Sequence, residues 1–359
     1  IGSGIILFLV CLSGTILTFE EEIKSVFSEE LEVNSSLDNT LSLEQLVTKI
    51  EGEGSVNSIT IPDASDEPYQ FSIKTDVKQR RGTTFYVDPF TGSYQKELKN
   101  AADGFFFTMF KMHRWLLLDS KIGRPIVGVA TLIFFFMCLS GLYLWFPKNL
   151  KWKNLKSGFK IKFSANWKRI NYDAHNTLGF YACIFLVIMT LTGLCWSFEW
   201  YRDAGTSVLG TKIFGNRGGG PAVESQMKAG EPDLSLSQIY GVANKEFPYE
   251  GELTISLPAN DTEPYRIRKK NAASMSPIIA DQLVLDRNGA VLQKEIFRDK
   301  PVNVQIASLI KPIHTGQIYG LFSKTIYFLA CLIATSLPVT GTLIWVNKLK
   351  KKRKRKMLS

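Results

Sequence analysis

Residues Ile126–Phe146 read IVGVATLIFFFMCLSGLYLWF, a stretch without a single charged side chain. A helix of about 20 apolar residues is long enough to cross the hydrocarbon core of a bilayer. Three other stretches of the 359-residue chain share this length and character: Ile1–Phe19, Phe180–Phe198 and Ile326–Val346. Four such stretches in one chain predict four transmembrane helices rather than the buried helices of a soluble core.

The positive charge of the chain is concentrated beside these stretches. The formal net charge is +10, and two basic segments, Lys148–Ile170 and Lys348–Lys356, each hold eight Lys or Arg and no acid. Basic residues that flank membrane helices stay on the cytoplasmic side, so both segments and both termini are expected in the cytoplasm. Residues 20–125 and 199–325 are then outside. The basic segments are expected to attract anionic lipid of the bilayer, and no nucleic-acid partner is expected.

The first apolar stretch begins at Ile1 and runs directly into three glutamates. A cleaved signal peptide has a basic start and a small-residue cleavage site, and Ile1–Phe19 has neither. We therefore expect a true span whose cytoplasmic leader is missing from this chain.

Two polar segments of similar sequence follow the first and third apolar stretches. LSLEQLVTKIEG begins at Leu41 and LSLSQIYGVANKEF at Leu234, and each predicts a helix with Ser42 or Ser235 as its N-cap. Two alternating runs around a shared Glu-Pro-Tyr sequence follow each helix and predict a hairpin, and a further strand is broken by an Asp…Gly turn. This order predicts one α+β module in residues 20–104 and a second in residues 200–305, related by an internal duplication.

The ends of the four apolar stretches are also alike. They read CLSGTILTFE, CLSGLYLWFP, TLTGLCWSFE and LPVTGTLIWV, and the shared glycines are Gly14, Gly141, Gly193 and Gly341. A Gly beside Ser or Thr lets helices approach closely in lipid, so we expect these glycines to pack helix against helix. The chain is then divided into span segments 1–19, 105–147, 171–199 and 306–347, with basic cytoplasmic segments 148–170 and 348–359.

Each of the three histidines precedes an apolar stretch. His113 and His314 lie 28 and 27 residues before the exit glycine of the span that follows, so they occupy equivalent positions of the duplication on the outer side. His175 lies 18 residues before its glycine on the cytoplasmic side, and its counterpart would precede Ile1. Neutral imidazole ligates haem iron, zinc or copper. The spans lack the Asp and Glu that metal transport or a proton relay would add.

Two imidazoles that face each other across a helix bundle suit a six-coordinate haem b among apolar side chains. We expect His113 and His314 to ligate an outer haem, and His175 to ligate an inner haem whose second ligand this chain lacks. Five further residues are candidates for the haem pockets, because they lie beside these histidines or at the outer mouth: Gly179, Gly316, Arg114, Trp115 and Arg124. Interfacial anchoring would explain the three larger side chains equally well.

The stretches around the histidines resemble the PepSY-associated transmembrane family: HRWLLLDSKIGRPIVG from His113, YDAHNTLGFY around His175 and HTGQIYG from His314. The two modules resemble PepSY domains, and the similarity covers essentially the whole chain in the same order. The family is described as iron-regulated inner-membrane proteins, and some members look like ferric-siderophore reductases with b-type haems. By resemblance, the three histidines match proposed haem ligands, whereas the family's histidine in the first span has no match.

The resemblance implies a reductase of the bacterial inner membrane, with its modules in the periplasm. Electrons would come from a cytoplasmic flavoprotein or from quinol and would reduce a ferric siderophore or another ferric chelate. A different class is a non-enzymatic scaffold whose PepSY modules bind a peptide, a protease or a transporter. A permease for a metal or siderophore is disfavoured by the small bundle without membrane acids. The expected fold class is a membrane α-helical bundle of four transmembrane helices with two α+β modules.

Overall fold

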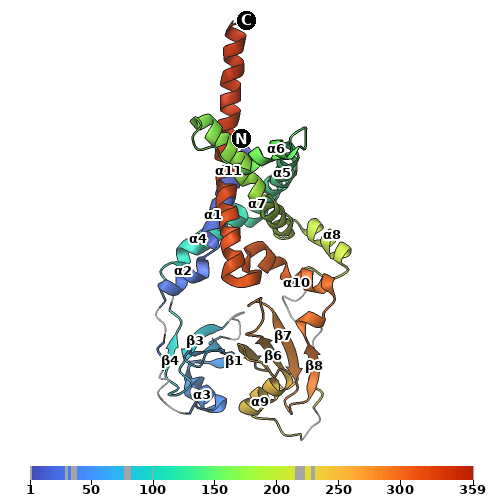
Figure 1. Cartoon of the computed structure of the whole chain (residues 1–359). Helices are drawn as coiled ribbons and strands as arrows, with labels where there is room; N and C mark the ends of the chain where they lie inside the picture. The colour runs from blue at the N-terminus through green and yellow to red at the C-terminus, as the bar shows by residue number, and fades with distance from the viewer. Residues whose placement is uncertain are drawn as a thin grey trace. The chain divides into compact units, whose positions relative to one another are not determined.

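The computed structural model describes residues 2–28, 31–33, 39–76, 82–98, 100–214, 223–227 and 231–358, with side chains as far as residue 353. Its elements separate into two compact units, each built from discontinuous segments of the chain. The helical unit comprises residues 1–26, 101–213 and 309–359, and the β unit comprises residues 27–100 and 214–308. Figure 1 labels helices and strands of both units where there is room.

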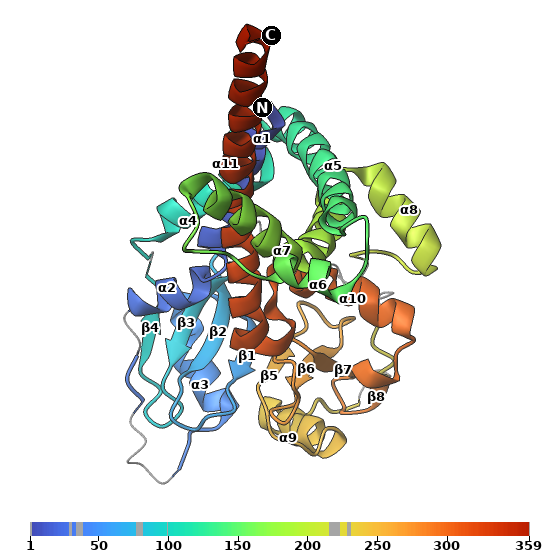
Figure 2. The same ribbon diagram turned by 45° about the horizontal axis from the view of Figure 1, so that its top comes forward.

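Four long helices form the helical unit: α1 (Gly2–Leu17), α5 (Ser120–Trp145), α7 (Trp167–Ser197) and α11 (Gly320–Leu358). Helix α7 packs against both α5 and α11, and α1 packs against α11 and against the shorter α4 (Asp103–Trp115), an arrangement that Figure 2 shows from a second side. Leu7, Phe134, Leu186 and Ala334, one from each long helix, meet in a single apolar cluster. The cluster holds the four helices together as a bundle.

Three helical segments in the described part of the chain are long and apolar enough to cross a membrane: α5, α7 and Gln317–Arg353. Helix α1 adds a fourth only if it is counted together with α2 (Glu20–Val26), from which a bend of 49° separates it. The bend has a physical reason, because the first turn of α2 consists of three glutamates. Their charges favour a helix N-terminus and disfavour the bilayer core. By length and composition, three of the four predicted spans are single helices. The predicted first span corresponds to the bent pair of helices α1 and α2.

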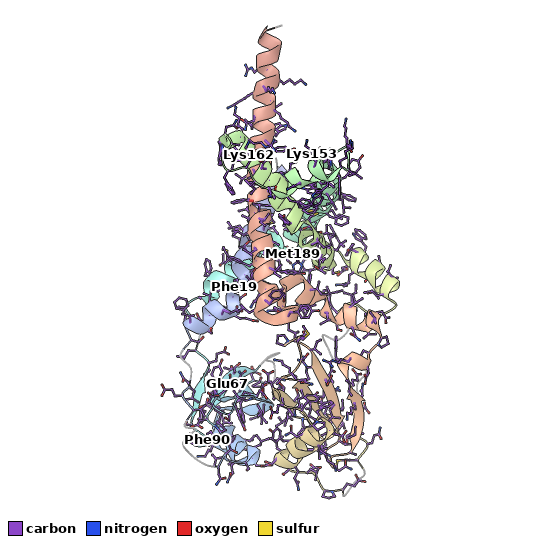
Figure 3. The ribbon with its side chains drawn as sticks, in the orientation of Figure 1. Phe19, Glu67, Phe90, Lys153, Lys162 and Met189 are labelled. Atoms are coloured by element: carbon purple, nitrogen blue, oxygen red, sulfur yellow. The ribbon has the colours of Figure 1, made fainter. Side chains whose placement is uncertain are left out.

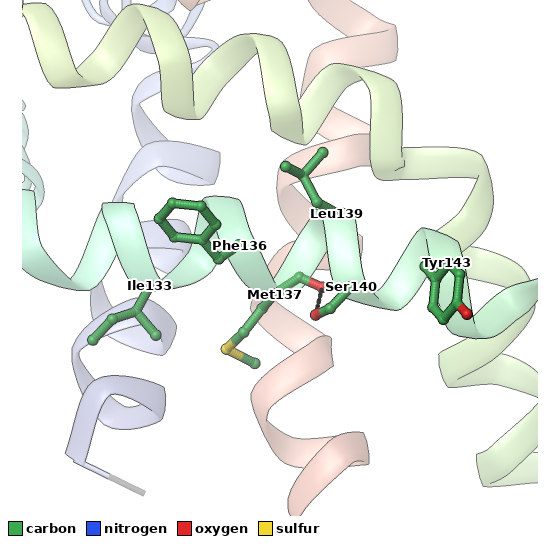
Figure 4. A pocket seen from close by; sticks show the side chains of 6 residues that line it. All are labelled: Ile133, Phe136, Met137, Leu139, Ser140 and Tyr143. Carbon is green, nitrogen blue, oxygen red and sulfur yellow. Dashed lines mark hydrogen bonds between the residues drawn. The ribbon is translucent and has the colours of Figure 1, made fainter.

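The outer face of α5 is apolar. An open hollow on this face, shown in Figure 4, is lined by Ile133, Phe136, Met137, Leu139, Ser140 and Tyr143. Phe136 is 63% exposed and Tyr143 80% exposed. Large apolar side chains exposed along so long a helix belong in contact with lipid rather than water. The chain is accordingly a membrane protein.

Shorter helices complete the helical unit: α6 (Trp152–Leu155), η2 (Lys156–Phe159), α8 (Glu199–Leu209), α10 (Val302–Thr315), which begins in the β unit, and η5 (Gln317–Tyr319). The basic segment between α5 and α7, on which Figure 3 labels Lys153 and Lys162, is tied to the bundle. The Thr177 hydroxyl donates to the Gly158 carbonyl at 2.9 Å. The Trp145 ring of α5 packs edge-on against Phe159 of this segment, with centroids 4.8 Å apart. Part of this segment is therefore folded onto the bundle.

The β unit contains one antiparallel sheet of eight strands in the order β4-β3-β2-β1-β5-β6-β7-β8. The strands are β1 (Ser55–Ile61), β2 (Tyr69–Lys74), β3 (Thr83–Val87), β4 (Tyr94–Lys96), β5 (Leu253–Ser256), β6 (Tyr265–Lys270), β7 (Ala280–Leu285) and β8 (Val291–Glu295). Strands β1 and β5 pair from Ser58 with Ser256 to Ile61 with Leu253. The two expected modules are therefore halves of a single sheet. Alternating sequences predict strands but carry no signal for which strands pair across the chain.

The helices and turns of the β unit follow the predicted local signals. Helix α3 (Leu43–Ile50) continues into η1 (Glu51–Glu53), α9 (Leu236–Glu246) is its counterpart in the second half, and η4 (Phe297–Asp299) follows β8. Ser42 and Ser235 are N-caps with complete capping boxes, as predicted. The hairpins β1–β2 and β5–β6 enclose the Glu-Pro-Tyr sequences, also as predicted.

One apolar core serves both halves of the sheet. Its fully buried side chains come from α3 and α9 and from the inner strands, and include Leu46, Ile59, Phe71, Ile239, Phe247 and Ile255. Burial of each such side chain contributes about 1.5–3 kcal/mol relative to exposure. Because both halves contribute to one core and one sheet, neither half is a separate folding unit.

Glu44 on α3 joins the two halves. Its carboxylate accepts hydrogen bonds from the backbone N and from Oγ of Ser237 on α9, both at 2.6 Å. Partial burial opposes ionisation, but the bonds from Ser237 outweigh it and lower the pKa of Glu44 from 4.5 to about 2. The stability that the ionised carboxylate contributes is therefore fully present above pH 4.5 and is lost as the pH falls toward 2.

We expect Glu44→Gln to destabilise the β unit by about 1–3 kcal/mol at neutral pH, because an amide accepts weaker hydrogen bonds than a carboxylate. Amide hydrogen exchange of β1 and β5 in the full chain measures this loss, and the difference from wild type should shrink in acid. The exposed Glu51 provides a matched control. An equal loss in Glu51→Gln, or a difference that does not change with pH, would contradict the assigned role of Glu44.

Candidate functional site

His113 on α4 and His314 on α10 lie side by side in the helical unit. Their ring centroids are 6.2 Å apart, and the planes of the rings are inclined by 57°. Both side chains are half-buried. The two outer histidines, which the duplication predicts as a pair, are thus neighbours although they are far apart in the sequence.

Each ring of this pair is oriented by a backbone carbonyl of a long helix. Nδ1 of His113 lies 2.8 Å from the Val10 oxygen of α1, and Nδ1 of His314 lies 3.1 Å from the Met189 oxygen of α7. A carbonyl oxygen only accepts, so Nδ1 donates its hydrogen in both contacts. In a neutral imidazole the lone pair is then on Nε2, the nitrogen that remains for a metal ion.

His175 on α7 is held in the same way but at another place. Its Nδ1 lies 2.8 Å from Oγ1 of Thr340 on α11. That hydroxyl donates its own hydrogen to the Ser336 carbonyl at 3.0 Å, so it accepts from His175. The three histidines therefore form two sites, a pair and a single residue. No group of three or more His, Cys, Asp or Glu that would hold a metal ion occurs among the described residues.

Each histidine packs against a glycine at the exit end of a long helix. An added Cβ would lie 2.9, 3.1 or 3.2 Å from Cε1 of the ring in the pairs Gly14 with His113, Gly193 with His314 and Gly341 with His175. Carbon atoms in unstrained contact are about 3.5–4.0 Å apart. The expected helix-to-helix packing is thus not the contact that these three glycines make: they leave room for imidazole rings.

A hydroxyl residue precedes each of these glycines, and we call the two together a hydroxyl–glycine step. In each step the hydroxyl oxygen lies within hydrogen-bond distance of the carbonyl three residues earlier, at 3.0 Å from Ser13, 3.1 Å from Ser140, and 3.2 Å from Thr192 and Thr340. The carbonyls that Ser13 and Thr192 contact also accept from His113 and His314. The sequence shows the steps, but nothing in it predicts their contact with histidine.

The fourth step, Ser140–Gly141 on α5, carries no imidazole. No other described atom lies within 4 Å of a Cβ added at Gly141. Ser140 lines the hollow of Figure 4, where its bond to the Met137 carbonyl is drawn. Three of the four steps therefore hold an imidazole, and the fourth is open in the described part of the chain.

The five weaker candidates occupy varied surroundings. The Arg114 guanidinium lies over the rings of Phe110 and Trp115, at 5.3 and 5.4 Å from their centroids. A Cβ at Gly179 would make an ordinary 3.6 Å contact with Leu337.

Gly316 and Arg124 mark the beginnings of other elements. Gly316 has a φ of 74°, and a Cβ there would lie 2.6 Å from the Tyr327 ring, so the backbone and this contact both require glycine. Arg124 is exposed near the start of α5. A role of the five residues in a haem pocket stays a prediction.

The turn after α4 is strained. Leu116 and Leu117 have φ values of 57° and 60°, in the left-handed region that costs a residue with a side chain about 1–2 kcal/mol. Their amides donate to the carbonyls of Met112 and Lys111 and so end the helix that carries His113. Such strain persists only where surrounding contacts fix the backbone, and it is common at functional sites. No pattern in the sequence predicts this strain.

The profile of the family described as PepSY-associated TM region matches residues 1–348. No curated protein matches the chain.

Proposed function

The chain belongs to the PepSY-associated transmembrane family, and we propose that it is a haem b protein that passes electrons across a membrane to a ferric chelate. The membrane is the bacterial inner membrane, which the chain crosses four times with both termini in the cytoplasm. The β unit, built from two duplicated modules, lies in the periplasm. Electrons come from a cytoplasmic flavoprotein or quinol, and the acceptor is a ferric siderophore or a related chelate.

One observation carries the proposal: His113 and His314 lie side by side, and a carbonyl engages Nδ1 of each ring, which leaves the lone pair on Nε2. Imidazole–metal bonds of about 2 Å on each side of one iron, with roughly 1 Å from each Nε2 to its ring centre, add up to about 6 Å. The observed separation of the ring centroids is 6.2 Å. The separation of the two rings therefore fits a pair of imidazoles that would hold a single haem iron.

The surroundings of the pair fit a flat apolar group. Gly14 and Gly193 leave the rings room that a Cβ would fill. The Trp196 ring lies 5.2 Å from that of His314. The carbonyls of Val10 and Met189 fix the orientation of the imidazoles and, by accepting from Nδ1, raise the basicity of Nε2. When bound, haem would supply one-electron transfer between the ferric and ferrous states.

His175 is proposed as a ligand of a second, inner haem. Thr340 fixes its Nδ1, and Gly341 accommodates its ring, so this single imidazole is oriented in the same way as each ring of the outer pair. Haems on both sides of the bundle would place redox centres at two depths of the membrane. The apolar side chains between the helices exclude water from this path.

Reduction is a chemically sensible fate for a ferric chelate. Fe(III) is held tightly by hard oxygen donors, and Fe(II) is a softer and less charged partner for them. An electron delivered to the chelate therefore weakens chelation and releases the metal. A reductase would use the histidine pair to hold its redox group, whereas a peptide-binding scaffold has no use for such a pair.

We expect the purified, haem-loaded protein to reduce ferric citrate stoichiometrically once it has itself been reduced and excess dithionite has been removed. An Fe(II)-specific dye measures the product under anaerobic conditions. His113→Ala should slow the reaction at least about ten-fold, because it removes one of two axial ligands. A wild-type protein that stays reduced in the presence of ferric citrate, or an unchanged rate in His113→Ala, would contradict the proposal.

A further inference from the structure

One face of the sheet in the β unit is polar. The side chains of Ile59, Phe71 and Ile255 lie in the core with α3 and α9, which cover one side of the sheet in Figure 1. Successive side chains of a strand point to opposite faces, so the residues between them lie on the other face. In both halves those residues include hydroxyls or amides, among them Thr60 and Gln70.

Two arginines are placed on this polar face in β6. Arg266 and Arg268 alternate with Ile267 and Lys269, which are buried. The Lys269 ammonium contacts the Phe247 carbonyl at the end of α9, which fixes the side of the sheet that faces the helices. Arg268 is exposed and Arg266 half-buried. Neither guanidinium forms an ion pair or a hydrogen bond with another described residue.

Neutral side chains lie opposite these arginines on both neighbouring strands, and all of them carry hydrogen-bonding groups except Val284 of β7, which lies opposite Arg266. Ser256 and Thr254 of β5 lie opposite Arg266 and Arg268, and Gln282 of β7 lies on the other side of Arg268. We call these five residues the arginine patch. The Thr254 hydroxyl is 3.0 Å from that of Thr60, so the polar surface continues into β1. The patch thus offers positive charge together with hydroxyl and amide groups.

The fold itself does not require the two arginines. Strand β2 holds the position in the first half of the sheet that β6 holds in the second, next to β1 and β5 respectively, and both strands begin at the Tyr of a Glu-Pro-Tyr sequence. At the positions of Arg266 and Arg268, strand β2 has Gln70 and Ser72. The same architecture is therefore built with neutral residues, and the charge of the second half needs another explanation.

We propose that the arginine patch binds ferric chelates that present anionic oxygens, such as carboxylate or phenolate groups. The inference rests on the proposed function, for which it names the substrate class. Guanidinium groups bind carboxylates through paired, charge-assisted hydrogen bonds, and the neighbouring hydroxyls and amide add further donors. A chelate with a positive periphery is repelled by the same charges.

The test is calorimetric titration of the full-length protein, without reductant, with ferric citrate as the anionic probe and ferrioxamine B as the cationic one. Replacing the arginines by their first-half equivalents, in R266Q/R268S, should weaken ferric citrate binding about ten- to hundred-fold, as loss of two charge-assisted contacts predicts. Binding of ferrioxamine B should not weaken. The matched control K49Q/K245Q removes two exposed positive charges from α3 and α9 and should leave both titrations unchanged.

Three results would overturn the inference. These are ferric citrate binding that is unaffected in R266Q/R268S, an equal loss in K49Q/K245Q, and equally tight binding of inorganic phosphate or iron-free citrate, which would mark a general anion site. R266K/R268K should retain part of the affinity, which separates loss of charge from misfolding. Because binding is measured without electron transfer, a protein that binds ferric citrate but does not reduce it contradicts only the proposed reductase function.

Discussion

His113→Ala and His314→Ala are each expected to remove the same haem from the purified protein, and His175→Ala is expected to remove a different one. The two outer rings are 6.2 Å apart with both Nδ1 atoms engaged, so both Nε2 atoms would be available to ligate one iron. Loss of either ligand lowers affinity by about ten- to a hundred-fold or more, as losses even of supporting groups do. A pyridine haemochrome assay gives haem per protein, and the low-spin optical spectrum shows which haem remains.

A sharper version of this experiment uses rescue. In His113→Gly, free imidazole can enter the space of the lost ring, and its addition should restore the low-spin spectrum of the outer haem. Hydrogen exchange of the β unit, which should not change, controls for misfolding. Independent losses in His113→Ala and His314→Ala, or loss of the same haem in His175→Ala, would refute the pairing.

Gly14→Ala and Gly193→Ala are expected to disrupt the outer site even though they leave every histidine in place. The added Cβ would lie 2.9 Å from Cε1 of His113 and 3.1 Å from Cε1 of His314, so the ring must move. Alanine is favoured over glycine within a helix by about 1 kcal/mol, so helix propensity alone would predict stabilisation. A loss of outer haem, measured by the same assay, therefore reports the displaced ring.

Gly141→Ala is the matched control for these variants. It is the same substitution in the fourth hydroxyl–glycine step, where no other described atom lies within 4 Å of the new Cβ. The outer haem should be unchanged in this variant. If Gly141→Ala lost as much outer haem as Gly14→Ala, the effect would belong to helix packing in general, and the role assigned to the glycines would be wrong.

Local patterns in the sequence were sufficient for much of the fold. Uncharged apolar stretches predicted α5, α7 and α11, because length and hydrophobicity alone decide whether a helix suits a bilayer. Ser42 and Ser235 predicted two helix starts, because a cap is decided within four residues. The repeat predicted that His113 and His314 are equivalent, and the structure places them side by side.

Features that depend on distant contacts could not be predicted. Pairing of β1 with β5 joins segments almost 200 residues apart. Neither strand has a sequence pattern from which its pairing partner could be predicted. The contact of Gly14 with His113 and the acceptor role of the Val10 carbonyl depend on how α1 and α4 pack. The left-handed Leu116 and Leu117 contradict local preference and are held by their surroundings.

The visible absorption spectrum of the protein, purified after expression with ample haem, is the most direct test of whether its histidines bind haem. We expect a red protein with a Soret band that sharpens and shifts on addition of dithionite, and a low-spin spectrum from the His113–His314 site. A colourless, haem-free protein that is nonetheless folded would contradict it, and the histidine pair would then need another explanation.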